Sequence, residues 1–316
     1  MPDWRQHRTL GSTYLSVSGL CIGTSPLGSM PDTYGYAVEE ERAVATVRAV
    51  LDSPINFLDT SNAYGAGRSE QRIGAALRAT PLPAGFVIAT KVDADPRTGD
   101  FSGERVMRSF EESLERMGLQ SVDLLHLHDP EFHIDFDAAM APQGAVNALV
   151  RLRESGRARY IGVATGTISV LTSYVETGIF DVVLNHNRYT LVDRSAEPLM
   201  EACARRNIGF INGAPYGGGI LARGSASTSR YGYAPAHPEV LRAVKAMEAA
   251  CARHGVPLAA AALQFSLRNP VVASTVVGLS SPARLEETAA LADVAIAQTL
   301  WDELETLAPP RETWLA

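Results

Sequence analysis

Short apolar runs alternate with amphipathic patterns along the whole chain. A short apolar run bounded by turn residues favours a buried strand, whereas apolar residues at every third or fourth position favour a helix with one buried face. The sequence therefore predicts eight units, each a strand followed by a helix. The apolar runs span residues 20–28, 55–61, 85–93, 122–128, 159–165, 180–187, 209–215 and 274–280. The helical patterns span residues 38–51, 69–78, 103–118, 146–156, 169–178, 196–207, 238–269 and 282–293.

Strands that alternate with helices pair in parallel, because each helix returns the chain to the same edge of the sheet. Eight such units favour closure into a (β/α)8 barrel, the TIM barrel of the α/β class. An open doubly wound sheet is the alternative, and it usually carries Gly-x-Gly-x-x-Gly after its first strand. The first run here ends in GTSPLG, and the segment 65–70, GAGRSE, lacks the third glycine. We expect a single barrel domain over residues 1–316, with an N-terminal β-hairpin within 4–19 at the barrel bottom.

Composition and charge narrow the classes of partner. A net charge of −7 over 316 residues lacks the basic footprint of a nucleic-acid-binding protein. No run of about 18 apolar residues occurs, and the N-terminal segment lacks the apolar core of a signal peptide. Three cysteines without CxxC spacing disfavour a disulfide scaffold and a structural zinc site. We therefore expect a cytoplasmic protein without a membrane span, nucleic-acid partner or resident metal, and no pattern indicates its oligomeric state.

Ionisable residues stand at the ends of three consecutive predicted strands. Asp59 ends the second strand, Lys91 the third and His128 the fourth, and Tyr64 lies in the loop after Asp59. The carboxyl ends of barrel strands carry the chemistry, so these side chains are expected to meet. A tyrosine hydroxyl has a pKa of about 10, and a neighbouring ammonium lowers it by favouring tyrosinate. An aspartate can partner that ammonium, and a histidine can orient a carbonyl oxygen.

Each of these residues alone also has a structural interpretation, as a buried ion pair, a packed phenol or a core imidazole. Their position at successive strand ends favours a proton-handling site instead. A metal-dependent hydrolase is the alternative from another class, because His126 and His128 have the spacing of two ligands on one strand and His186 could join them. The last predicted strand, within 274–280, has no carboxylate, which disfavours such a metal site.

At these residues the chain resembles the aldo-keto reductase superfamily over nearly its whole length. INFLDTSNAYGAGRSEQRIGAAL resembles the family signature of Asp-Thr, Tyr-Gly and then Ser-Glu before a helix. IATKV, VDLLHLHDP and RYIGVAT resemble its lysine strand, histidine strand and fifth strand. IGTSPLG, NRYTLVDRS and APYGGGILARG further resemble the branch of aldose, L-fucose, L-galactose and pyridoxal dehydrogenases.

The resemblance implies an NAD(P)-dependent oxidoreductase whose nicotinamide cofactor lies extended across the barrel mouth. By it, Tyr64 is the general acid/base and Lys91 lowers the pKa of Tyr64. Asp59 pairs with Lys91, and His128 aligns the substrate oxygen. The cofactor contacts that it implies are Gly23, Thr24, Asp59, Ala164, Thr165, Asn185, Ala214, Pro215, Gly217, Leu221, Gly278, Ser280, Arg284 and Glu287.

Two departures from the family pattern concern the cofactor. Ala164 and Thr165 replace the Ser-Asn pair with which many relatives hold the carboxamide, and Asn185 is expected to compensate. Many NADP-using relatives also carry a lysine or arginine near Gly278–Ser280, where this chain has none and only Arg284 remains. A phosphate needs charge-assisted partners, so the sequence favours NAD, or use of both cofactors, over strict use of NADP.

The expected substrate is a sugar oxidised at C1 to a lactone, or otherwise a small aldehyde such as pyridoxal. Ser25, Tyr34 and His126 are expected to line its pocket. A non-catalytic subunit that keeps the fold and the cofactor is a further alternative, because some relatives of this superfamily serve in that way. The presence of all four residues of the proton-handling site disfavours it.

Overall fold

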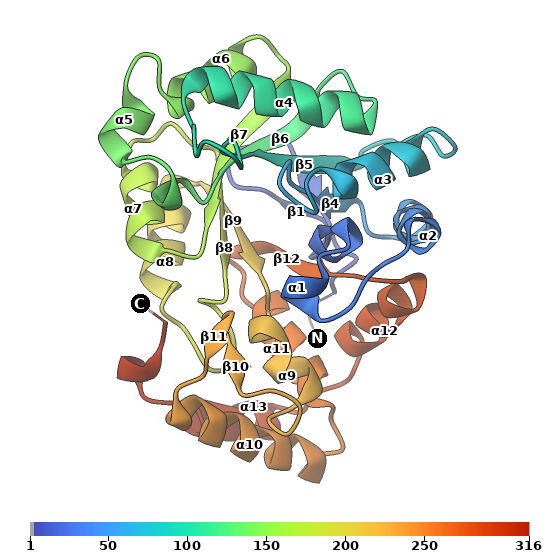
Figure 1. Ribbon diagram of the computed structural model, residues 1–316. Helices are drawn as coiled ribbons and strands as arrows, with labels where there is room; N and C mark the ends of the chain where they lie inside the picture. The colour runs from blue at the N-terminus through green and yellow to red at the C-terminus, as the bar shows by residue number, and fades with distance from the viewer. Residues whose placement is uncertain (1–2, 316) are drawn as a thin grey trace.

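Eight parallel strands close into a barrel in the computed structural model, which describes residues 3–315 (Figure 1). The order of the strands around the barrel is β12-β3-β4-β5-β6-β7-β8-β9. Apart from β12, which closes the ring next to β3, they follow the order of the chain. The strands are β3 (Leu20–Gly23), β4 (Phe57–Asp59), β5 (Val87–Val92), β6 (Val122–His128), β7 (Ala158–Thr165), β8 (Val182–His186), β9 (Gly209–Gly213) and β12 (Val272–Gly278).

Helices surround this barrel and confirm the (β/α)8 architecture that the sequence predicts (Figure 1). The apolar face of the helix after β5 is buried, with Val106, Phe110, Leu114 and Met117 in the core, and the helix ends at Gly118 with φ 71°. The long helices are α2 (Glu40–Leu51), α3 (Arg68–Leu77), α4 (Gly103–Met117), α6 (Ala145–Glu154), α7 (Ile168–Glu176), α8 (Glu197–Arg206), α10 (Pro238–Arg253), α11 (Leu258–Leu267), α12 (Pro282–Ala292) and α13 (Gln298–Thr306).

Several short elements lie in loops for which the sequence predicts no regular structure, except that residues 25–28, predicted as part of the first strand, form a 3-10 turn after it. They are too short for a hydrophobic period to reveal them. After β3 lie η1 (Ser25–Gly28) and α1 (Pro31–Tyr34), and after β6 lie η2 (Pro130–Phe132) and α5 (Phe136–Met140). After β9 lie η3 (Gly217–Gly219), α9 (Ile220–Arg223), β10 (Arg230–Tyr231) and β11 (Ala234–Pro235), and η4 (Arg311–Thr313) follows α13.

The N-terminal hairpin closes the end of the barrel at which the strands begin, as predicted. Its strands are β1 (Arg8–Thr9) and β2 (Ser16–Val17), which pair antiparallel. Its apolar side chains, such as Leu10 and Leu15, join the cluster that fills the barrel interior. At the tip, Gly11 has φ 60°, and a side chain there would lie 2.2 Å from the backbone nitrogen of Gly209. The tight fit against β9 therefore requires glycine at this position.

Strand period and register bring polar residues together at the other end of the barrel. Phe57, Ala89 and Leu124 point into the interior cluster, and side chains two positions further on point the same way. Those positions are Asp59, Lys91 and His126, and His128 follows on the same side of β6. Parallel pairing sets Lys91 opposite His126. The polar end of the barrel is thus built by the three consecutive strands β4, β5 and β6.

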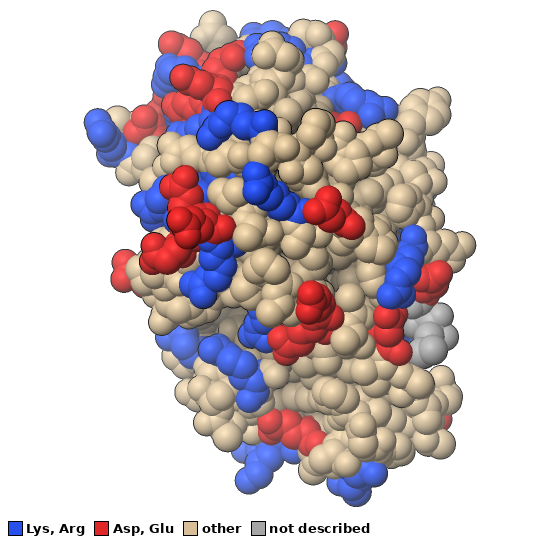
Figure 2. All heavy atoms as spheres, turned by 90° about the vertical axis from the view of Figure 1, so that its right-hand side faces the viewer, with Lys and Arg blue, Asp and Glu red and all other residues tan. Residues whose placement is uncertain are grey.

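The charged residues are dispersed over the face shown in Figure 2, where Lys and Arg are interspersed with Asp and Glu. This agrees with the moderate net charge of −7. Within residues 3–315, no helix combines the length and the apolar character needed to cross a membrane.

Candidate active site at the carboxyl ends of the strands

Lys91 joins an aspartate and a tyrosine in one buried cluster. Its Nζ donates to Asp59 Oδ1 at 2.6 Å, to the Thr60 carbonyl oxygen at 2.6 Å and to Tyr64 Oη at 3.2 Å. The Lys91 and Asp59 side chains are only 2% and 4% exposed. A buried ammonium and a buried carboxylate are each costly to desolvate alone, so the pair depends on both partners. The predicted contact of Asp59, Lys91 and Tyr64 is present.

His128 stands beside this cluster. Its ring meets the ring of Tyr64 edge-on, with the centroids 5.8 Å apart and an interplanar angle of 83°. Its Nδ1 lies 2.6 Å from Asp93 Oδ1, and the two side chains are 14% and 13% exposed. Burial lowers the pKa of His128, but the Asp93 carboxylate outweighs burial and the pKa is raised above its usual value. The fourth predicted residue therefore reaches the site, with a carboxylate partner of its own.

Burial opposes the expected effect of Lys91 on Tyr64. It raises the pKa of this phenol well above its usual value, and the Asp59 carboxylate adds to the rise. The Lys91 ammonium, 3.2 Å from the Tyr64 hydroxyl, also donates to Asp59 and to the Thr60 carbonyl oxygen. That Lys91 lowers the pKa of Tyr64 stays a prediction.

His126 does not line an open pocket, contrary to the sequence prediction. Its side chain is fully buried, one layer below the mouth, and burial lowers its pKa well below the usual value. The ring fits there because Gly162 on β7 has no side chain, and a Cβ on Gly162 would lie 2.3 Å from the His126 Nδ1. Neither ring nitrogen has a hydrogen-bond partner within residues 3–315. His126 is therefore a neutral core residue beneath the site.

Three of the predicted cofactor residues lie at the carboxyl ends of strands: Thr24 directly after β3, Thr165 on β7 and Asn185 on β8. Thr24 is buried and its hydroxyl donates to the Asp59 carbonyl oxygen at 3.0 Å, while the Thr165 hydroxyl donates to Glu131. Asn185 Nδ2 donates to the Thr165 carbonyl oxygen at 2.9 Å, and its buried Oδ1 has no partner within residues 3–315. A buried amide oxygen without a donor suits the NH2 group of a carboxamide. Asn185 is therefore better suited than Thr165 to bind the carboxamide of a nicotinamide ring.

The loop after β9 makes a tight turn in which only Gly218 of residues 214–218 is exposed. Ala214, Gly217 and Gly218 all have positive φ, at 53°, 57° and 76°. Gly218 is exposed, Pro215 is buried and Gly217 packs against the ring of Tyr231, so few side chains cover this turn. Such a turn can present backbone amides to a pyrophosphate. The side chain of Leu221 is fully buried in the adjoining helix α9, and the contact of this residue with a cofactor stays a prediction.

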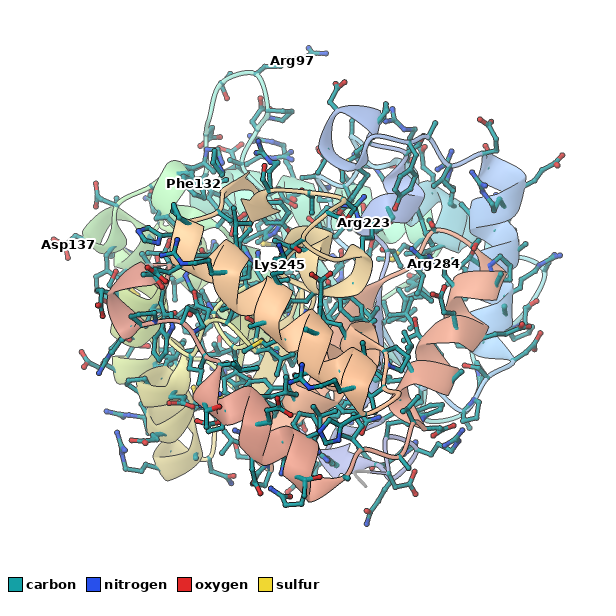
Figure 3. All side chains as sticks on the ribbon, turned by 90° about the horizontal axis from the view of Figure 1, so that it is seen from below. Arg97, Phe132, Asp137, Arg223, Lys245 and Arg284 are labelled. Atoms are coloured by element: carbon teal, nitrogen blue, oxygen red, sulfur yellow. The ribbon has the colours of Figure 1, made fainter. Side chains whose placement is uncertain are left out.

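The predicted adenosine end lies at the start of α12. Arg284 Nη1 donates to Glu287 Oε2 at 2.7 Å, and the two side chains are 53% and 52% exposed. Figure 3 labels Arg284 on α12. Gly278 is exposed at the end of β12, where it pairs with Gly23, and Ser280 follows in the loop. Arg284, the arginine that the sequence offers for a 2′-phosphate, is therefore already paired with a carboxylate.

Aromatic residues from two loops form the rim on one side of Tyr64. Tyr34 Oη donates to Ser25 Oγ at 2.7 Å, so these two predicted pocket residues contact each other. The ring of Tyr34 lies 5.9 Å from the ring of Tyr36, and Tyr233 packs edge-on against His186 at 6.2 Å. Burial raises the pKa of Tyr34 to about 12, so its hydroxyl stays neutral. We call Tyr34, Tyr36 and Tyr233 the aromatic rim.

The geometry gives no support to the metal-hydrolase alternative. Within residues 3–315, no three His, Cys, Asp or Glu side chains form a group that could hold a metal ion. His126 is enclosed beneath Gly162, and His186 packs against Tyr233. The ring nitrogens that the alternative needs do not converge.

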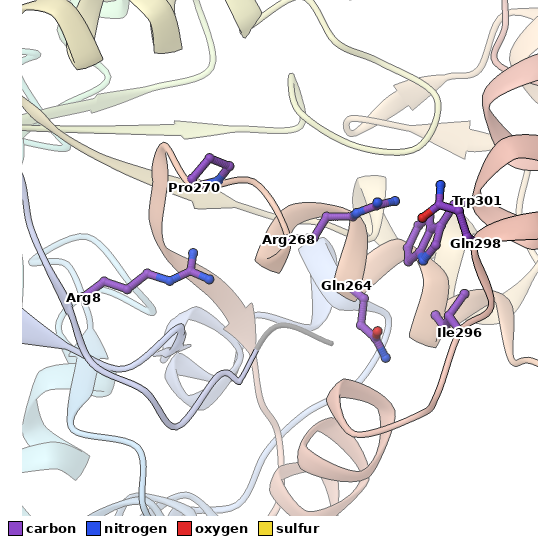
Figure 4. Close-up of a pocket in the computed structure, with 7 residues that line it drawn as sticks. All are labelled: Arg8, Gln264, Arg268, Pro270, Ile296, Gln298 and Trp301. Carbon is purple, nitrogen blue, oxygen red and sulfur yellow. The ribbon is translucent and has the colours of Figure 1, made fainter.

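A hollow at the opposite end of the barrel belongs to the scaffold (Figure 4). Arg8 lines it, and its guanidinium donates to the carbonyl oxygens of Val272 at 2.7 Å and Leu267 at 2.9 Å. Arg268 lies over the ring of Trp301, 4.3 Å from its centroid. Both arginines therefore hold structural elements together, far from the strand ends that carry the polar cluster.

Sequence reasoning missed Asp93 and Ser61. Asp93 follows β5 directly and Ser61 follows β4 by two residues, so both lie where barrel chemistry is expected. The signal was present as a carboxylate two positions after Lys91, on the same side of the strand by its period. The resemblance assigns no role to that position.

The comparisons with known proteins identify the family of this chain. The model of the Aldo/keto reductase family matches residues 19–309. L-galactose dehydrogenase of Arabidopsis thaliana is 36% identical over 97% of this chain and 96% of its own length. D-threo-aldose 1-dehydrogenase of a Pseudomonas species is 34% identical over 92% and 94%. Pyridoxal 4-dehydrogenase of Microbacterium luteolum is 30% identical over 95% and 97%.

A solved structure agrees at the level of the fold. The holo form of an aldo-keto reductase from Bacillus halodurans superimposes with a TM-score of 0.75, at 23% identity and with 96% of each chain covered. The family model covers most of the chain and three relatives are similar over nearly their whole length. This chain is therefore a member of the aldo/keto reductase family and an NAD(P)-dependent oxidoreductase.

Proposed function

We propose that this protein oxidises aldoses at C1 with NAD or NADP as hydride acceptor. The observation that carries the proposal is the cluster in which Lys91 Nζ contacts Asp59 Oδ1 at 2.6 Å and Tyr64 Oη at 3.2 Å. The similarity to an L-galactose dehydrogenase and to a D-threo-aldose 1-dehydrogenase supports the substrate class. When bound, the nicotinamide would take the hydride from C1.

The residues of this chain then have to bind the sugar and move one proton. Tyr64 is proposed to exchange that proton with the oxygen on C1, with Lys91 stabilising tyrosinate and Asp59 holding Lys91 in place. His128 is proposed to orient the same oxygen, since its ring stands edge-on to Tyr64 at 5.8 Å. Asn185 would hold the carboxamide, and the turn from Ala214 to Gly218 would hold the pyrophosphate.

The aromatic rim suits a sugar ring. Tyr36 is 43% and Tyr233 is 53% exposed, so both rings remain available to a ligand. Their apolar faces match the C–H surfaces of a pyranose, and the phenol groups can bond to its hydroxyls.

A substrate panel tests the proposal. Aldoses, pyridoxal and simple aldehydes are each offered with NAD and with NADP, and turnover is followed at the nicotinamide absorbance. We expect reduction of the cofactor with at least one aldose, at the same rate with and without a metal chelator. Turnover of pyridoxal with no aldose accepted would refute the substrate class, and cofactor binding without turnover on the whole panel would favour a non-catalytic subunit.

The pair of Arg284 and Glu287 predicts the cofactor preference. Glu287 occupies the guanidinium of Arg284 and would repel a 2′-phosphate, so we expect NAD to be preferred over NADP. Glu287→Gln should then lower the KM for NADP severalfold and leave the KM for NAD nearly unchanged. Glu286→Gln, on the same helix, is the matched control for the loss of one negative charge. Equal effects of the two variants on both cofactors would contradict the assignment.

A further inference from the structure

Asp93 connects the histidine of the site with the loop that carries the tyrosine. Its Oδ1 lies 2.6 Å from His128 Nδ1. Its Oδ2 accepts from Ser61 Oγ at 2.6 Å and from the Ala63 backbone nitrogen at 2.9 Å. Ala63 directly precedes Tyr64, so one carboxylate holds both sides of the place where the substrate oxygen is proposed to bind.

Asp93 is itself held on its backbone. Its nitrogen donates to Ser109 Oγ at 3.0 Å, and its carbonyl oxygen accepts from Arg105 Nε at 3.1 Å. Both partners lie on α4, and Arg105 is fixed in turn by Glu112. The carboxylate therefore stands on a rigid support, which a residue needs if it is to orient others.

We infer that Asp93 is a positioning residue that fixes the tautomer of His128 and the distance between His128 and Tyr64. An ionised carboxylate only accepts hydrogen bonds, so the Nδ1 of His128 carries the hydrogen. The Nε2 is then the nitrogen that meets the substrate. It accepts from a hydroxyl when the ring is neutral and donates to a carbonyl oxygen when the ring is protonated. The inference rests on the proposed function in one respect, namely that the substrate oxygen is the group that contacts Nε2.

Several charged or titratable groups surround His128, and Asp93 has the shortest contact among them. Asp129 Oδ2 lies 3.7 Å from Nε2. Around the ring lie Asp59 and Tyr64 on the β4 side, Lys91 on β5, His126 on β6 and His186 on β8. Asp93 and Asp129 raise the pKa of His128, whereas burial and Lys91 lower it. Loss of the Asp93 charge should therefore lower this pKa.

Nitrogen NMR of the cofactor-free protein tests the inference without any substrate. The chain has 7 histidines, so His128→Gln identifies the signals of His128. In the unaltered protein we expect neutral His128 to carry its hydrogen on Nδ1, with Nε2 bare. In Asp93→Asn, the titration midpoint of His128 should fall by about one pH unit or more. Asp129→Asn is the matched control, and its shift should be smaller because Asp129 is farther away and 33% exposed.

Kinetics give a second readout. In the oxidative direction, activity is lost as pH falls through the pKa of His128, because a protonated Nε2 cannot accept from the hydroxyl. Asp93→Asn should move this acidic limb of kcat/KM to lower pH by the same amount as the NMR midpoint. Midpoints that stay in place in Asp93→Asn would mean that Asp93 does not act on His128.

Two outcomes would overturn the inference. One is a neutral His128 with its hydrogen on Nε2 in the unaltered protein. This measurement does not depend on whether any variant folds. The other is a titration midpoint that moves no further in Asp93→Asn than in Asp129→Asn. Absence of aldose turnover would refute the proposed function instead, and would leave the NMR result as it stands.

Discussion

Tyr64→Phe is expected to lower kcat by about 10²- to 10⁴-fold with every substrate that the protein accepts. The change removes only the hydroxyl that would exchange the proton, and the ring remains to pack edge-on against His128. Lys91 loses a 3.2 Å contact but keeps its two shorter ones to Asp59 and Thr60. The melting temperature and the Kd for the cofactor should therefore change little.

The measurement compares initial rates of the variant and the parent at saturating cofactor. Tyr14→Phe is the control, because Tyr14 is 90% exposed in the N-terminal hairpin at the other end of the barrel. Its kcat should equal that of the parent. Unchanged turnover in Tyr64→Phe would show that another group moves the proton, and the assignment of Tyr64 would fail.

Asp59→Asn is expected to lower the free energy of unfolding by about 3–5 kcal/mol, because it leaves the buried ammonium of Lys91 without its charged partner. The Lys91 side chain is 2% exposed, so water cannot replace the carboxylate. The Thr60 carbonyl oxygen remains, but a neutral acceptor does not compensate a buried charge. Denaturant unfolding of the cofactor-free protein measures the loss.

The double variant Asp59→Asn/Lys91→Met separates the charge from the packing. Replacing a buried ion pair with apolar side chains is often neutral, so the double variant should recover most of the stability lost in Asp59→Asn. It should remain inactive, since it lacks the ammonium beside Tyr64. A double variant less stable than Asp59→Asn would mean that the cost arises from packing and not from the unpaired charge.

The barrel and the four proton-handling residues follow from sequence because both depend on period. The alternation of strands and helices predicts closure, and the strand period of two sets Asp59 and Lys91 on the inward side. The position of Tyr64 cannot be predicted from the strand period alone, because Tyr64 lies in a loop. Its placement comes from the resemblance of the surrounding motif, and the structure puts its hydroxyl 3.2 Å from Lys91.

What the sequence does not predict depends on contacts between strands. His126 has the period of a pocket residue, but the absent side chain of Gly162 on the next strand lets its ring lie buried. The pKa of Tyr64 depends on how deeply the folded chain buries its hydroxyl and on the Asp59 carboxylate from the neighbouring strand end. The pairing of Asp93 with His128 joins the end of β5 to the end of β6. No local sequence pattern predicts this contact.

The residues proposed for proton transfer and the residues of the aromatic rim come from separate parts of the chain. All residues proposed to handle the proton lie between Asp59 and His128, whereas the aromatic rim comes from the loops after β3 and β9. Selection for a new substrate can therefore act on the rim loops while the chemistry stays constant. Inherited changes at the ends of β4 to β6 would instead weaken the reaction on all substrates alike.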